Sequence, residues 1–393
     1  MRFRHPDGQT VHLAYCTNVH PAEDLDGVLR QLDAYALPVR ERLGVPRLGL
    51  GLWLAREVAT TLRSDAAALA RLRSELDARG LEVVTLNGFP YAGFGQEVVK
   101  LRVYSPDWSE PERLRYTVDL AWLLAALLPD DVARGSISTL PLAWREPWGA
   151  PAQAAARRQL DVLAGELATV AAETGRTIRV AIEPEPGCVV ETGEQVTAFL
   201  AGLDAERIGL CLDACHLAVA FEDADGLVAR LDALGLSVVK LQASAALHAD
   251  DPSDPGTRAA LASFVEPRYL HQTRERVGGE LAGRDDLDAA LAAGDGVAGL
   301  PAGAAWRVHF HVPLHADPEP PLRSTREELQ DTLRTLFAGA AARTDTVEVE
   351  TYTWHVLPER LRPQGDAGLV AGIAAELTWA RDNLLALGLQ EIG

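Results

Sequence analysis

The chain has 393 residues, of which 48% are hydrophobic and 24% charged, as is typical of a globular protein. Its 37 basic and 56 acidic residues give a formal net charge of −19, the wrong sign for a protein that binds the phosphate backbone of nucleic acid. Four cysteines are too few for a disulfide scaffold, and no apolar run reaches the 18 or so residues needed to cross a membrane. We find no secretory leader pattern and expect a cytoplasmic protein that acts on a small molecule.

Short β-rich segments alternate along the chain with long segments of helical period. We predict strands at 11–18, 47–53, 81–89, 135–141, 178–183, 208–213, 238–244 and 346–352. Helices are expected at 24–42, 65–79, 110–128, 152–174, 193–202, 224–234, 324–338 and 366–387. Eight strands, each followed by a helix, predict an α/β protein with the (β/α)8 TIM barrel fold.

One segment interrupts this alternation. Residues 245–323 lie between the seventh strand and the next helix, and within them "WRVHFHVPLH" (306–315) has the pattern of one further strand. We expect a single barrel domain over residues 1–393, with 245–323 as an insertion after strand 7. That is the face on which barrel enzymes carry their functional loops.

Carboxylates recur at inward positions close to the ends of three predicted strands. Alternate residues of a barrel strand face the lumen. In "TVEVETY" the valines belong against the helices, so Glu348 and Glu350 face inward, and the same parity turns Glu183 and Asp213 inward. Unpaired buried charges cost several kcal/mol, so these groups must share a cation, protons or basic partners. Structural salt bridges or helix caps are the alternative interpretation.

A divalent cation is the simplest explanation for the three converging carboxylates. Oxygen-rich sites with one or two imidazoles suit Mn²⁺, Mg²⁺, Co²⁺ or Zn²⁺. The nitrogen has two sources: His216, three residues after Asp213, and the alternating pair His309 and His311. Which of these histidines binds the metal is left open by the sequence.

The stretch "GLCLDACH" also contains two cysteines, Cys211 and Cys215. A thiolate zinc site would need two more soft ligands nearby, and Cys16 and Cys188 belong to other segments. Buried cysteine is usually an apolar filler, so we assign the chemistry of this stretch to Asp213 and His216.

Two carboxylates beside a metal suggest a reaction. A metal that polarises adjacent carbonyl and hydroxyl oxygens acidifies the C–H bond between them, and Glu183 and Glu350 could remove and return that proton. This is the chemistry of sugar epimerases and aldose–ketose isomerases, whereas the same metals can activate water in a hydrolase. In "NGFPYAGF", the side chains of Asn87, Phe89, Tyr91 and Phe94 could line a substrate ring or pack loop against loop.

The segments "AIEPEPG", "CLDACH", "VHFHVP" and "VEVETYTW" resemble the xylose-isomerase-like TIM barrel superfamily, which includes sugar phosphate isomerases and epimerases and the endonuclease IV type of repair enzyme. Its pattern is Glu-Pro ending strand 5, Asp-x-x-His ending strand 6, a histidine at strand 7 and Glu ending strand 8. Glu183, the pair Asp213 and His216, and Glu350 match it. At strand 7 this chain has Gln242, so the fourth ligand is Gln242, His309 or His311.

More narrowly, "AYCTNVHPAE", "NGFPYAGF", "VYSPDW", "GSISTLP", "YLHQ", "HFHVP" and "ETYTWHVLP" resemble the EboE-type metabolite-traffic proteins. The resemblance implies a cytoplasmic barrel that works beside other proteins of an operon for processing or exporting a secondary metabolite. Those relatives tend to carry histidine where this chain has Gly95, so the resemblance gives no ligand in that loop.

These arguments lead to a metal-dependent isomerase or epimerase acting on a small polyhydroxylated or carbonyl compound. The alternatives are a hydrolase of the endonuclease IV type and a non-catalytic metabolite-binding protein. Glu183 and Glu350 are the predicted catalytic residues, and the predicted metal ligands are Glu183, Asp213, His216, Gln242, His311 and Glu350. Predicted substrate contacts are Asn18, His20, Asn87, Tyr91, Glu185, Lys240 and His309.

Overall fold

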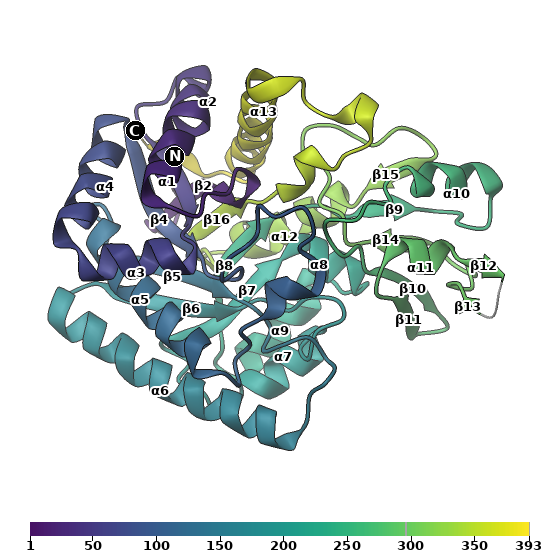
Figure 1. Cartoon of the computed structure of the whole chain (residues 1–393), viewed down its shortest axis with the longest axis horizontal. Coiled ribbons are helices and arrows are strands. Elements are labelled where there is room, and N and C mark those ends of the chain that lie inside the picture. Colours follow the sequence, from purple (N-terminus) through teal and green to yellow (C-terminus); the bar gives the residue numbers. More distant parts are fainter. Residues whose placement is uncertain (295–296, 393) are drawn as a thin grey trace.

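The computed structural model describes residues 1–294 and 297–392, and its centre is a closed barrel of parallel strands (Figure 1). The strands follow one another around the barrel in chain order, and the last pairs with the first to close it. They are β2 (Thr10–Cys16), β3 (Leu48–Trp53), β4 (Leu81–Asn87), β5 (Arg134–Thr139), β6 (Thr177–Ile182), β7 (Ile208–Asp213), β8 (Val238–Ala243) and β16 (Thr346–Val349). The predicted (β/α)8 barrel is therefore confirmed.

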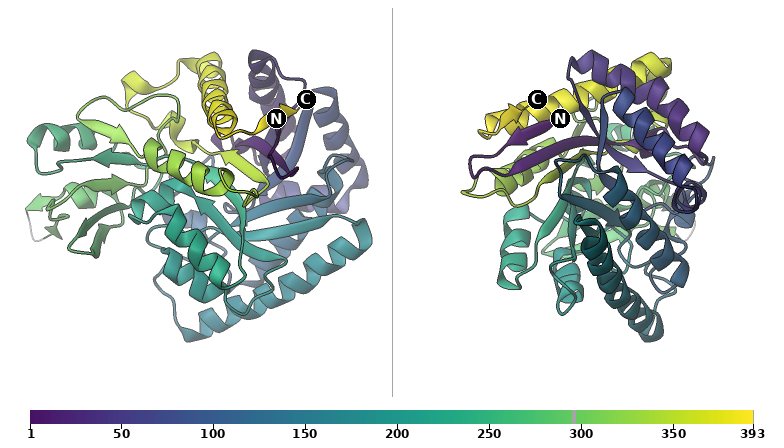
Figure 2. Two further views of the ribbon diagram at one scale, coloured as in Figure 1. Left: turned by 180° about the vertical axis from the view of Figure 1, so that it is seen from behind. Right: turned by 90° about the vertical axis from the view of Figure 1, so that its left-hand side faces the viewer.

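Helices surround the barrel and cover the outward aliphatic side chains of the strands (Figure 2). They are α1 (Leu25–Gln31), α2 (Leu37–Leu43), α3 (Arg56–Ser64), α4 (Ala66–Ala78), α5 (Pro111–Leu127), α6 (Ala150–Thr174), α7 (Gly193–Leu200), α8 (Ala214–Val219), α9 (Ala224–Ala233), α12 (Arg326–Phe337) and α13 (Gly365–Ala386). A π-helical turn (Leu32–Ala36) joins α1 to α2. No helix in the described part of the chain is both long and apolar enough to span a bilayer.

The chain between β8 and α12 forms a second sheet beside the barrel, on the right in Figure 1. This sheet is antiparallel and has the order β11–β10–β14–β9–β15. Its strands are β9 (Leu247–Ala249), β10 (Thr273–Val277), β11 (Glu280–Arg284), β14 (Trp306–Val308) and β15 (Leu322–Ser324). The helices α10 (Pro255–Ala262) and α11 (Leu287–Leu291) and the short strands β12 (Ala293–Gly294) and β13 (Val297–Ala298) complete the segment. The division into one domain with an insertion stays a prediction.

The long loop between β4 and α5 lies against this second segment. The backbone N–H groups of Val99 and Lys100 both donate to the carbonyl of Arg268, and the Lys100 ammonium pairs with Asp286. This loop contains a short 3-10 helix (Lys100–Tyr104), and another (Tyr352–His355) follows β16. The mouth of the barrel is therefore bordered by segments far apart in the sequence.

Several local expectations needed correction. The strand predicted over 306–315 ends at Val308, because only Trp306, Arg307 and Val308 pair with both neighbouring strands. His309 and His311 thus follow a strand rather than sharing one. The helices α3 and α8 were not predicted, nor were the end strands β1 (Arg2–Arg4) and β17 (Gln390–Ile392), which pair with each other antiparallel at the edge of the barrel sheet.

Candidate metal centre

Three carboxylates converge at the carboxyl end of the barrel. Asp213 is the last residue of β7, while Glu183 and Glu350 directly follow β6 and β16. All three are buried, and each places a carboxylate oxygen within 4.8 Å of the others. Glu183 Oε2 and Asp213 Oδ2 have no hydrogen-bond partner among the described residues. Unpaired anionic oxygens so close together fit a shared cation.

Burial and mutual repulsion change the protonation of these groups. Burial, followed by the charges of Glu350 and Asp213, raises the pKa of Glu183 well above its usual value. Burial and the charges of Asp213 and Glu348 raise the pKa of Glu350 to about 8. Without a cation both carboxyls therefore tend to hold protons near neutral pH, and a bound cation would displace them.

This competition predicts that metal stabilises the protein more as the pH rises. The ordinary pKa of Glu350 is 4.5, and its pKa in the folded protein is about 8. Between these two pH values, the Glu350 carboxyl is more protonated in the metal-free folded protein than in the unfolded chain. Stability without metal is therefore lost as pH rises through this window, whereas a cation gains affinity there. We expect the gain in Tm on adding Mn²⁺ to be larger at about pH 8 than at about pH 5.5. Thermal unfolding with and without Mn²⁺ measures this gain at each pH. A gain in Tm that did not change with pH would contradict the assignment of the metal site to these carboxylates.

His311 presents a free imidazole nitrogen to this cluster. Its Nδ1 lies 2.6 Å from the carbonyl oxygen of Glu350 and donates to it, because a carbonyl can only accept. Its Nε2 is buried and has no partner among the described residues. His311, Asp213 and His216 belong to one group whose ligand atoms all lie within 4.8 Å of one another. A histidine ligand is commonly anchored in this way through its other nitrogen.

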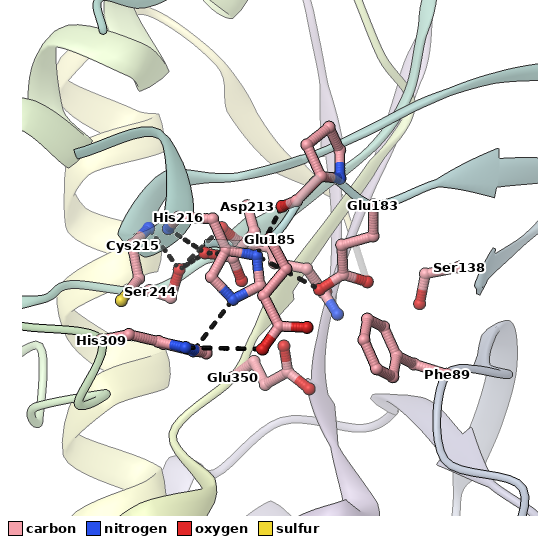
Figure 3. A network of polar contacts seen from close by, with 12 residues as sticks. Phe89, Ser138, Glu183, Glu185, Asp213, Cys215, His216, Ser244, His309 and Glu350 are labelled. Atoms are coloured by element: carbon pink, nitrogen blue, oxygen red, sulfur yellow. Dashed lines mark hydrogen bonds and ion pairs between the residues drawn. The ribbon is translucent and has the colours of Figure 1, made fainter. Parts of the chain in front are cut away.

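His216 differs from His311 because both of its ring nitrogens have protein partners. Nδ1 donates to the carbonyl of Pro184 over 2.9 Å, and Nε2 lies 3.0 Å from Nε2 of His309 (Figure 3). Burial lowers the pKa of His216 to about 4, so the ring is neutral. The backbone N–H of His216 donates to Asp213 Oδ1, which leaves the other oxygen of Asp213 available.

Gln242 stands on β8 between the strands that carry Asp213 and Glu348. Its side chain is fully buried, and neither its amide oxygen nor its amide nitrogen has a partner among the described residues. An amide oxygen can bind a hard divalent cation such as Mg²⁺ or Mn²⁺. Gln242 therefore stays a predicted ligand alongside the histidines.

Two amides hold Glu350 in place. The side-chain nitrogens of Asn18 and Asn87 donate to Glu350 Oε1 over 2.7 and 2.8 Å. Both asparagines also line the cavity above the carboxylates. They were predicted as substrate contacts, and the structure places them where they can orient Glu350 as well.

A cavity with an empty volume of about 530 Å³ opens above the carboxylates. Glu185 and His309 both line it, as predicted for substrate contacts. The hydroxyl of Tyr104 donates to Glu185 over 2.8 Å, and Nδ1 of His309 lies 2.7 Å from Gln272 Oε1. Burial raises the pKa of Glu185 to about 8, so this carboxyl can hold a proton near neutral pH.

A profile of the family described as "Xylose isomerase-like TIM barrel" matches residues 55–274. The chain belongs to this family. A proposed sugar phosphate isomerase/epimerase from Anabaena variabilis is 15% identical over 96% of this chain and 99% of its own, with a TM-score of 0.53. A xylose isomerase domain protein from Alicyclobacillus acidocaldarius is 18% identical over 95% and 99%, with a TM-score of 0.46.

Another solved member of the xylose isomerase-like barrels, from Mycobacterium smegmatis, was crystallised with magnesium. It is 13% identical over 97% of this chain and 94% of its own, with a TM-score of 0.48. At such identities the likeness concerns the fold. The search of curated proteins found no match.

Three of the predicted substrate contacts of this xylose isomerase-like barrel lie outside the cavity. His20 stacks on Tyr35, with ring centroids 4.7 Å apart, and Tyr91 packs edge-on against Tyr116. Lys240 is fully buried within the barrel. Contact of these three side chains with the substrate stays a prediction, which their position outside the cavity lining does not support.

The position of Lys240 follows from its partner, Glu348. The two side chains form an ion pair in the barrel lumen, and both are fully buried. A Cβ atom at Gly51 would lie 1.3 Å from Glu348 Oε1, so a larger residue at this position of β3 would displace the Glu348 carboxylate. Glu348 faces inward as the parity argument predicted, but it is neutralised by Lys240 rather than shared with the three carboxylates.

No two cysteines of the described chain belong to one possible metal-ligand group. All four are buried and free, and burial raises the pKa of Cys211 and Cys215 well above the usual thiol value. Among the described residues, Cys215 lies near His309 and His311 in a possible ligand group, but neither Cys16 nor Cys211 belongs to one. The assignment of the stretch to Asp213 and His216 agrees with this geometry.

One supporting residue was missed by the sequence analysis. Glu376 on α13 is buried, and its Oε1 accepts from the hydroxyl of Thr351 over 2.6 Å and from the backbone N–H of Leu314 over 3.0 Å. It thereby ties the residue after Glu350 to the segment that follows His311. A lone acidic residue within the apolar stretch "GIAAELTWA" was the available signal.

Proposed function

We propose that the chain is a metal-dependent isomerase or epimerase acting on a small molecule with adjacent carbonyl and hydroxyl groups. One observation carries the proposal: Glu183, Asp213 and Glu350, from three separate strands, bring buried oxygens within 4.8 Å of one another. The unpartnered Nε2 of His311 adds a nitrogen donor beside them. The donor set suits Mn²⁺, Mg²⁺, Co²⁺ or Zn²⁺.

The chemistry divides between the cation and the protein. A divalent ion bound by these residues would polarise the substrate oxygens and acidify the C–H bond between them. Glu183, whose Oε2 has no protein partner, is placed to take that proton, and Glu350, fixed by Asn18 and Asn87, is the candidate to return one.

A second polar group flanks the proposed reaction centre. Glu185, His309 and His216 line the same cavity, and the two imidazoles face each other through their Nε2 atoms. Tyr104 and Gln272 hold Glu185 and His309 in place. We assign to this group the orientation of substrate oxygens beyond the metal.

Hydrogen exchange tests the proposed reaction directly. The Mn²⁺-loaded protein would be incubated in D₂O with 2-hydroxycyclohexanone and with dihydroxyacetone, and loss of the C–H signal next to the carbonyl followed by NMR. We expect exchange with at least one compound that stops when a chelator removes the metal. In Glu183→Gln it should slow by about 100-fold or more, because a general base typically contributes that much. Retention of the compound without exchange would favour the binding-protein alternative instead.

The charge of the cavity argues against the hydrolase alternative. Glu183, Glu185 and Glu350 line it, and Lys100, the one lysine or arginine among its described lining residues, is paired with Asp286. Beyond the proposed metal ion, a nucleic-acid backbone would find no unpaired lysine or arginine among these lining residues to bind its further phosphates. Exposure of abasic-site DNA to the Mn²⁺- or Zn²⁺-loaded protein should therefore give no cleavage.

We place this activity in a cytoplasmic pathway for a secondary metabolite, on the resemblance of seven segments to EboE-type metabolite-traffic proteins. On this proposal the barrel works beside other proteins of a processing or export operon. Identification by mass spectrometry of a compound retained by the purified protein would test it. A ligand from central sugar metabolism would argue against it.

A further inference from the structure

The cavity above the carboxylates has two chemically different halves. Glu183, Glu350 and His311 form its floor. Its upper wall is built from apolar and aromatic side chains: Phe89, Phe94, Val99, Val103, Tyr269, Leu270 and Tyr352. A ligand that reaches the floor with its oxygens must lay the rest of its surface against this wall.

Three rings of the wall pack against one another and form what we call the aromatic triad. Ring centroids are 5.4 Å apart for Phe94 and Tyr269, 5.5 Å for Phe94 and Tyr352, and 4.9 Å for Tyr269 and Tyr352. The rings come from the β4–α5 loop, the segment before β10 and the turn after β16, so distant parts of the chain build one surface. Aromatic side chains bury a large apolar area and pack favourably against other rings, so this surface suits an apolar or aromatic ligand group.

The aromatic triad directly adjoins the proposed metal ligands. The ring of Tyr352 lies 4.7 Å from that of His311, centroid to centroid. A compound held by its oxygens at the floor would therefore place the adjacent carbon atoms against the triad.

The wall is poorly suited to a sugar phosphate. Lys100 is paired with Asp286, and no other lysine or arginine of the described chain lines the cavity. Sugar hydroxyls placed against the triad would lose their hydrogen bonds to water without gaining partners, which costs free energy for each group.

We propose that the substrate is an uncharged carbocyclic or aromatic compound with adjacent carbonyl and hydroxyl oxygens at one edge. Its oxygens face the carboxylate floor and its apolar ring lies against Phe94, Tyr269 and Tyr352. The inference rests on the proposed function, because the metal centre supplies the attachment for the oxygens. It narrows the polyhydroxylated or carbonyl compound expected from the sequence to a more apolar one that carries the carbonyl group.

Three hydroxamates that share one metal-binding group test this inference. Acetohydroxamate, benzohydroxamate and phosphoglycolohydroxamate would be titrated calorimetrically into the Mn²⁺-loaded protein. We expect benzohydroxamate to bind at least about tenfold more tightly than acetohydroxamate, because its ring buries apolar area against the triad. Phosphoglycolohydroxamate should bind no more tightly than acetohydroxamate, because no unpaired lysine or arginine among the described lining residues can pair with its phosphate.

Variants in the β4–α5 loop test whether the aromatic triad causes the preference for benzohydroxamate over acetohydroxamate. Phe94→Ala should remove most of the ratio between benzohydroxamate and acetohydroxamate, and Phe94→Leu, which retains more side-chain volume, should leave an intermediate ratio. Leu101→Ala is the matched control, because Leu101 belongs to the same loop but is 51% exposed and does not line the cavity. Circular dichroism would check that each variant is folded.

The outcomes separate this inference from the proposed function. Equal affinities for acetohydroxamate and benzohydroxamate, or a clear preference for phosphoglycolohydroxamate, would overturn the apolar substrate while leaving the metal centre standing. Absence of binding by all three to the metal-loaded protein would overturn the metal centre, and this inference with it.

Discussion

Replacing Asp213 and Glu350 together by alanine is expected to abolish metal binding. Both contribute oxygens to the cluster with Glu183, and the double variant leaves a single carboxylate. Loss of an outer partner of a metal ligand alone typically costs about 10- to 100-fold in affinity, so the loss of two ligands should exceed 100-fold. Metal analysis of the purified protein and calorimetric titration with Mn²⁺ measure the effect.

The double variant should not lose much stability in the absence of metal. Burial and mutual repulsion raise the pKa of Glu350 and Glu183, which means that holding these carboxyls in the metal-free cluster costs free energy of folding near neutral pH. Removing two of its members relieves that repulsion. Against this gain, Asp213 caps α8 by accepting from the backbone N–H of His216, and loss of such a cap costs about 1 kcal/mol.

Two control variants show whether a loss of metal binding comes from the missing carboxylates. Asp223→Ala is the matched control, because Asp223 caps α9 in the same way through Gly226 but lies outside the metal centre. The isosteric pair Asp213→Asn with Glu350→Gln keeps the packing and removes the charges. Unchanged metal content in the Asp213→Ala, Glu350→Ala protein would refute the assignment of the centre.

Substitution of His311 by alanine should weaken metal binding, whereas substitution of His216 should mainly affect turnover. His311→Ala removes the free Nε2 beside Asp213 and should weaken metal binding about tenfold or more. His216→Ala should leave the metal affinity within a few-fold, because both nitrogens of His216 are already engaged by Pro184 and His309. Its effect should fall on turnover, since His216 lines the cavity.

The absorption spectrum of the Co²⁺-loaded protein distinguishes these cases. We expect it to change in His311→Ala and to stay close to that of the parent protein in His216→Ala. The reverse result would identify His216 as the nitrogen ligand. If Gln242→Leu changed the spectrum while both histidine variants left it unchanged, the fourth ligand would be the amide on β8.

The sequence by itself determined the barrel and the position of its carboxylates. Strand and helix periods are local properties, so eight parallel strands could be read from short segments, and the closed barrel bears this out. The same alternation of side chains turned Glu183, Asp213 and Glu350 toward one end of the lumen. Their convergence needed only the rule that parallel strands end at the same face.

Only the tertiary structure decided which partners these residues have. The free nitrogen of His311, the engaged nitrogens of His216 and the pairing of Lys240 with Glu348 all depend on groups from distant segments. The aromatic triad, likewise, joins rings that lie far apart in the sequence. Hydrogen-bond partners and ring contacts are set by how loops and sheets pack, which no local period specifies. The sequence therefore determined where the chemistry can occur, and the packing decided which side chains are free to perform it.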